Sequence, residues 1–91
     1  MVYDKNKLLQ IVKKNEKSEI DCLKKLVSIP TCVNKNHDMK PIIAYLTEEF
    51  EKRGYEVQTF STSGSPVVVA EMNRGMEKTL MFYNHYDVQP E

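Results

Sequence analysis

The chain has 91 residues, enough for one small domain with a thin core, and its 41% hydrophobic content is typical of a globular protein rather than a disordered one. Its 13 basic and 13 acidic residues cancel, which argues against nucleic acid or an anionic membrane as a partner. No apolar run approaches the roughly 20 residues of a membrane span. The N-terminus also lacks the pattern of a secretory signal. We therefore expect a cytoplasmic protein in which Cys22 and Cys32 are free thiols.

The first third of the chain is predicted to be helical. Apolar residues recur at spacings of three and four, first at residues 8–12 and again at residues 20–27. The polar stretch 13–19 between them is compatible with an exposed part of one long helix or with a break between two helices. The pattern ends at Ile29, because a residue that precedes a proline avoids the helical region. A loop is expected over residues 31–36.

A second helix is predicted from about Asp38 to Gly54. Asp38 is a suitable N-cap, because its carboxylate can accept from the free backbone N–H groups of the first turn. Pro41 falls in that first turn, where its missing N–H costs nothing, and Gly54 provides the C-terminal stop. The buried face of this helix is expected to comprise Ile42, Ile43, Leu46 and Phe50.

The hydrophobic period then changes from about 3.6 to 2, which predicts strands. Residues 55–60 are β-branched and aromatic, and residues 67–70 form a continuous apolar run that is typical of a strand covered on both faces. After a turn at residues 73–78, residues 79–83 are predicted to form a third strand. The order of two or three helices followed by three strands predicts an α/β fold. Because both faces of such a sheet need helices, we expect the sheet to continue into further sequence.

His85 and Asp87 are the residues best suited to chemistry. They follow the predicted third strand two positions apart, and in extended backbone such residues project to the same side. The imidazole can bind a metal ion, and the carboxylate can fix its tautomer and raise its basicity. On spacing alone, a pair that only hydrogen-bonds to the following turn is the better interpretation.

The residues around this pair make the prediction more specific. Residues 80–90 read Leu-Met-Phe-Tyr-Asn-His-Tyr-Asp-Val-Gln-Pro, which resembles the first metal-site motif of the dizinc metallopeptidase and deacylase family. That family includes carnosinase-like dipeptidases, acetylornithine deacetylase, succinyl-diaminopimelate desuccinylase and aminoacylase, and this version is most similar to the dipeptidase branch. Residues 26–30 and 50–55 agree with it more loosely. Asn84 departs from the motif, since many members have Gly there, but Asn tolerates a left-handed turn.

The resemblance implies the N-terminal part of a three-layer α/β/α zinc-peptidase domain, spanning residues 1–91. It implies that His85 is a metal ligand to one of two zinc ions and that Asp87 is the neighbouring catalytic carboxylate. The substrate would be a dipeptide or an N-acyl amino acid. The family's bridging aspartate, glutamate general base and remaining ligands lie further along the chain, so we expect at most a partial zinc site and no activity from this chain alone.

His37 has no motif around it and is expected to be a solvated loop residue, and nothing in the sequence places Cys32 near His85. The partner could be the remainder of the catalytic domain or a second copy of the chain. The alternative function is a non-catalytic α/β interaction module that associates through its open sheet edge.

Overall fold

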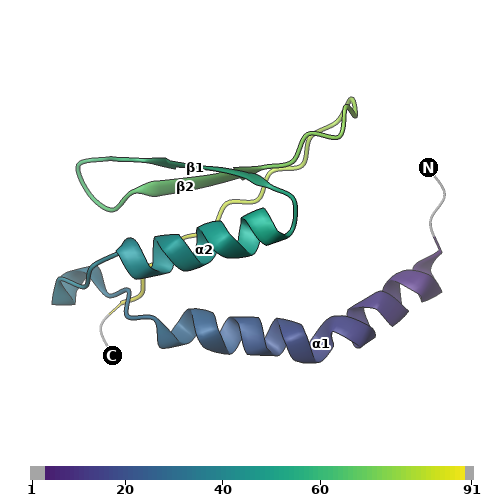
Figure 1. Cartoon of the computed structure of the whole chain (residues 1–91), viewed down its shortest axis with the longest axis horizontal. Coiled ribbons are helices and arrows are strands. Elements are labelled where there is room, and N and C mark those ends of the chain that lie inside the picture. Colours follow the sequence, from purple (N-terminus) through teal and green to yellow (C-terminus); the bar gives the residue numbers. More distant parts are fainter. Residues whose placement is uncertain (1–3, 90–91) are drawn as a thin grey trace.

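The computed structural model describes residues 4–89. It is a small α/β structure in which two helices precede a two-stranded antiparallel sheet (Figure 1). The elements in chain order are helix α1 (Lys5–Ser28), the 3₁₀ turn η1 (Val33–Lys35), helix α2 (Lys40–Lys52) and strands β1 (Glu56–Phe60) and β2 (Val67–Glu71). Neither helix in the described part of the chain is long and apolar enough to cross a membrane.

Helix α1 is one continuous helix of 24 residues, so the predicted alternative of a break between two helices is not observed. Its first turn is capped by Asp4, whose carboxylate accepts from the backbone N–H of Asn6 at 2.9 Å. It ends before Ile29, which has extended backbone because Pro30 follows it. Figure 1 shows that the helix bends along its length. Within the helix, the Asn15 side-chain amide donates to the carbonyl of Ile11 at 2.9 Å.

Helix α2 begins one residue later than predicted, with Met39 rather than Asp38 at the N-cap position. Asp38 still contributes, because its carboxylate accepts from the N–H of Lys40 at 2.9 Å. At the other end Gly54 takes a φ of 90°, a conformation that favours glycine, and its N–H donates to the carbonyl of Glu51 at 3.0 Å. Of the four residues predicted to be buried, Ile42 is fully buried and the other three are half-buried.

Strands β1 and β2 form a hairpin around the loop at residues 61–66, and α2 lies against both strands (Figure 1). The register pairs Glu56 with Glu71 and Phe60 with Val67. Exposure alternates along β2, where Val68 and Ala70 are half-buried and the residues between them are exposed. The predicted cover on both faces of this strand is therefore wrong, and the hairpin has one packed face.

The predicted third strand does not form within the described residues. Residues 79–83 are not paired in any ladder, and the side chains of Leu80 and Tyr83 are 79% and 84% exposed. A run of strand-forming residues needs both a neighbouring strand and an apolar cover, and the described chain supplies neither here. The segment instead returns from a turn at Gly75, whose φ is 71°, toward the loop between α1 and α2 (Figure 1).

The buried residues of the described chain cluster at that loop and at the start of α2. They are Thr31, Cys32, Met39 and Ile42. The C-terminal segment reaches this cluster, because Val88 forms a parallel bridge with Cys32 and donates its N–H to the carbonyl of Thr31 at 3.2 Å. The small core therefore also fixes the position of the segment that carries His85 and Asp87.

Candidate functional site

Two anchors hold the segment with the candidate residues. On one side the Tyr86 hydroxyl donates to the carbonyl of Pro66, at the start of β2, at 2.6 Å. On the other side Val88 is bound to Thr31 in the loop after α1. Burial raises the pKa of Tyr86 above its ordinary value of 10.0, so its hydroxyl remains a donor into more alkaline solution than a free tyrosine would. The hairpin and the helical loop thus fix the backbone between residues 86 and 88.

The structure brings the side chains of His85 and Asp87 together. Nδ1 of His85 lies 3.0 Å from the backbone carbonyl oxygen of Asp87 and 3.3 Å from its Oδ1. A proton on Nδ1 would be donated to these oxygens, and the lone pair would then reside on Nε2, which is the form in which imidazole binds a metal ion. The His85 side chain is 76% exposed, so its ring is accessible to a ligand.

His37 has a structural role that the sequence did not indicate. Its Nδ1 accepts from the backbone N–H of Cys32 at 2.9 Å, and the residue is half-buried. The expectation of a solvated loop histidine is therefore wrong. His37 therefore stabilises the loop that also contacts Val88 through Cys32.

The structure also places Cys32 beside the C-terminal segment, through its bridge with Val88. This proximity could not be predicted because it depends on the path of the chain over more than fifty residues. Cys22 and Cys32 are both free thiols, as expected, and Cys32 is buried. Burial makes Cys32 a packing residue of the small core.

The zinc site implied by the resemblance can be tested against these donors. A catalytic zinc ion normally has about three protein ligands and one open position. Within residues 4–89, no three side chains of His, Cys, Asp or Glu come close enough together to hold a metal ion. Among the described residues, His85 with its orienting carboxylate is suited to supply one protein ligand, and a complete zinc site is not formed.

A second polar cluster, between α1 and α2, was not anticipated from the sequence. The Tyr45 hydroxyl donates to the carbonyl of Cys22 at 3.1 Å and lies 3.2 Å from its Sγ. On the same side Arg53 forms an ion pair with Glu49 at 2.7 Å and a longer one with Glu19 at 3.9 Å. No periodic signal marks the Tyr45–Cys22 and Arg53–Glu19 contacts, because each joins residues of two separate helices.

This cluster is best understood as a link between the helices. The pKa of Tyr45 is raised to about 12, mainly by the side-chain hydrogen bond with Cys22 and secondly by burial, so the phenol remains a neutral donor. The carboxylate of Glu49 is already satisfied by Lys52 and Arg53. The phenol of Tyr45 and the guanidinium of Arg53 thus join α1 to α2, and the bonds from Lys52 and Arg53 to Glu49 lie within α2 and its C-cap.

Comparison of the chain with protein-family models, with curated proteins and with solved structures found no match. A functional proposal therefore depends on the motif at residues 80–90 and on the geometry around His85.

Proposed function

We propose that this chain is the N-terminal portion of a cytoplasmic zinc-dependent dipeptidase or N-acyl-amino-acid deacylase. The observation that carries the proposal is the His85–Asp87 pair, in which Nδ1 faces the backbone and carboxylate oxygens of Asp87 at 3.0 and 3.3 Å. A metal-binding histidine usually has such a partner on its second nitrogen, which fixes the ring and its tautomer. The sequence that surrounds the pair supports the same assignment.

Each residue of the pair has a distinct part in this proposal. His85 would bind one of two zinc ions through Nε2, and Asp87 would keep the proton on Nδ1 and raise the basicity of the ring. When bound, zinc polarises an amide carbonyl and lowers the pKa of a bound water. The Tyr86 and Val88 anchors would hold the pair in place before the ion arrives.

The rest of the site would come from the remainder of a catalytic domain. Two features of the described chain are consistent with such a partner. Residues 80–83 expose four large side chains in succession, and the described strands leave β2 paired on one edge only. A three-layer α/β/α domain would pair and cover this segment. We therefore expect that the 91-residue chain on its own does not hydrolyse dipeptides.

Zinc titration of the full chain tests the proposal. We expect weak binding, micromolar or weaker, that His85→Ala abolishes and Asp87→Asn reduces. His37→Ala is the matched control, since His37 is engaged with Cys32 and should leave zinc binding unchanged. Isothermal titration with zinc alone measures all three variants. Equal zinc binding by wild type and His85→Ala would exclude His85 as a ligand, and dipeptide hydrolysis by the purified chain would show that it needs no remainder.

The alternative, a non-catalytic interaction module, is favoured by one observation. Among the described strands β2 is paired on one edge only, and residues 79–83 are exposed and strand-forming. Unpaired strand edges are sites at which a partner can add a strand. The two functions differ in what His85→Ala changes. In the module, this substitution leaves both zinc binding and association with a strand-donating partner unaltered.

A further inference from the structure

Helix α1 presents a long apolar face that the described chain leaves open. None of its 24 residues is buried. Six residues spaced alternately by four and three positions form a stripe along this helix, and this spacing is the period of a coiled-coil seam. The residues of this stripe are Leu9, Lys13, Glu16, Ile20, Leu23 and Val27. Within it Leu9 is 55% exposed and Ile20 is 47% exposed, which is unusual for the apolar side of so long a helix.

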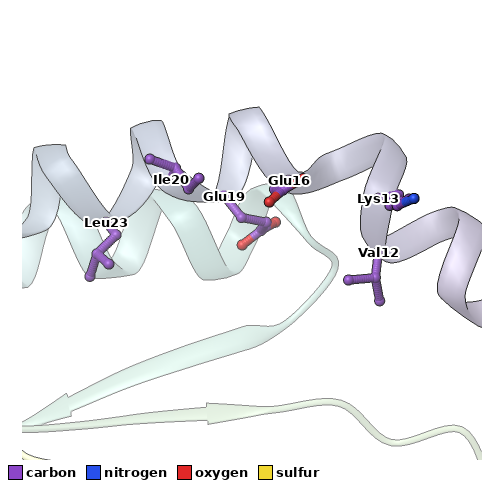
Figure 2. Close-up of a pocket in the computed structure, with 6 residues that line it drawn as sticks. All are labelled: Val12, Lys13, Glu16, Glu19, Ile20 and Leu23. Carbon is purple, nitrogen blue, oxygen red and sulfur yellow. The ribbon is translucent and has the colours of Figure 1, made fainter.

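The stripe lies next to the side of α1 that meets α2, and Leu23 borders both. The link to α2 runs through Cys22 and Glu19, which contact Tyr45 and Arg53. A shallow groove of about 480 Å³ lies on α1. Figure 2 shows that its lining side chains all come from this helix. The lining residues are Val12, Lys13, Glu16, Glu19, Ile20 and Leu23. One basic residue, Lys13, and two acidic residues, Glu16 and Glu19, thus lie among the apolar side chains of this groove.

We propose that a second copy of this chain packs antiparallel against this face. The charges of Lys13 and Glu16 on α1 favour a second copy of α1 as the partner. If the two helices cross at the midpoint between residues 14 and 15, Leu9 lies opposite Ile20 of the second copy, and Lys13 lies opposite Glu16. The two-fold axis then repeats both contacts. Two apolar layers would flank two ion pairs, and each helix would supply both halves of every contact.

Other arrangements of the same two helices place charges badly. A parallel pair sets Lys13 against Lys13 and Glu16 against Glu16, and like charges in apposition are destabilising. An antiparallel pair shifted by one heptad sets Lys13 against Leu23 and Glu16 against Ile20, which would desolvate both charges without a partner. Polar residues in such a seam specify register and orientation at some cost in stability. In the antiparallel register with paired charges, the four stripe positions nearest the crossing, at residues 9, 13, 16 and 20, all face a matching partner.

Charge reversal in the full chain tests this arrangement without metal or substrate, so its outcome is independent of the proposed function. By sedimentation equilibrium we expect a reversible monomer–dimer equilibrium. Lys13→Glu and Glu16→Lys should each weaken dimerisation by about tenfold or more, since each creates two like-charge contacts. The double variant K13E/E16K should restore it, because reversal on both positions recreates the opposite-charge pairs only in an antiparallel dimer.

Lys14→Glu is the matched control. It makes the same change in net charge one residue away, at a position that does not line the groove, and should leave the dimer unchanged. Circular dichroism of every variant establishes that α1 is still helical. A chain that is monomeric at all concentrations would overturn the proposal, as would a double variant that dimerises no better than the single ones. Equal weakening by Lys14→Glu and Lys13→Glu would also overturn it.

Discussion

The two helices of this protein have similar amphipathic sequences but different surroundings. The apolar side of α2 lies against the hairpin, and Ile42 is 1% exposed. The apolar side of α1 has no buried residue, and Leu23 and Val27 are 58% and 72% exposed. The difference shows that an amphipathic pattern specifies that a face needs cover but not which part of a molecule provides it. For α2 the cover is the next segment of the same chain, and for α1 the described chain does not contain it.

The largest expected effect comes from breaking the packed region. Ile42→Ala removes the most buried side chain of the described core and leaves a cavity, and we expect it to lower the free energy of unfolding by about 2–5 kcal/mol. The matched control is Ile11→Ala on α1, where the side chain is 55% exposed and the expected change is within about 0.5 kcal/mol. Urea unfolding followed by circular dichroism measures both. Equal losses would mean that α1 is as well covered as α2.

The sequence predicted those parts of the fold that depend on local signals. The extent of α2 follows from Pro41 and Gly54, and both strands of the hairpin follow from a change of period. The prediction was wrong where the outcome depends on distant cover. Residues 79–83 have the composition of a strand, yet within the described chain no neighbouring strand pairs with them. Val67 belongs to an apolar run typical of a doubly covered strand, but α2 covers only one face of the sheet.

The candidate site likewise has one feature that the sequence predicts and others that it does not. The proximity of His85 and Asp87 could be expected from their spacing of two residues. The contacts that position them could not, because Tyr86 reaches Pro66 and Val88 reaches Thr31 over separations that no periodic signal spans. The role of His37 was also missed, since its acceptor bond from Cys32 depends on the exact course of a loop.

A smaller effect is expected from loosening residues 86–88, the segment held between the hairpin and the loop after α1. Tyr86→Phe removes the hydroxyl that donates to Pro66 at 2.6 Å, and we expect a loss of about 1 kcal/mol in the free energy of unfolding. Hydrogen exchange of the Val88 amide, which donates to Thr31, should become faster because its segment has lost one of two anchors. Tyr83→Phe is the control, at an 84% exposed ring in the same segment. Unchanged exchange in Tyr86→Phe would mean that the Thr31 contact alone holds the motif.

The smallest effect concerns the polar link between the two helices. Hydrogen bonds from Arg53 and then from Lys52 hold the pKa of Glu49 below its ordinary value of 4.5. A carboxyl group whose pKa is lower in the folded state stabilises the fold above its unfolded pKa, and this contribution is lost as the pH falls through the folded value. Wild type should therefore lose more stability between neutral pH and about pH 3 than Glu49→Gln does, since the amide has no such titration.

Glu51→Gln provides the comparison for that measurement, because it removes the same charge from an exposed position on the same helix. The difference between the Glu49→Gln and Glu51→Gln acid profiles isolates the Arg53 and Lys52 bonds from the general change in net charge. It should be small, since both partners of the ion pair contact solvent and their attraction is screened. Added salt should shrink it further. Parallel acid profiles in the two variants would show that the bonds from Arg53 and Lys52 to Glu49, which lie within α2 and its C-cap, contribute no measurable stability.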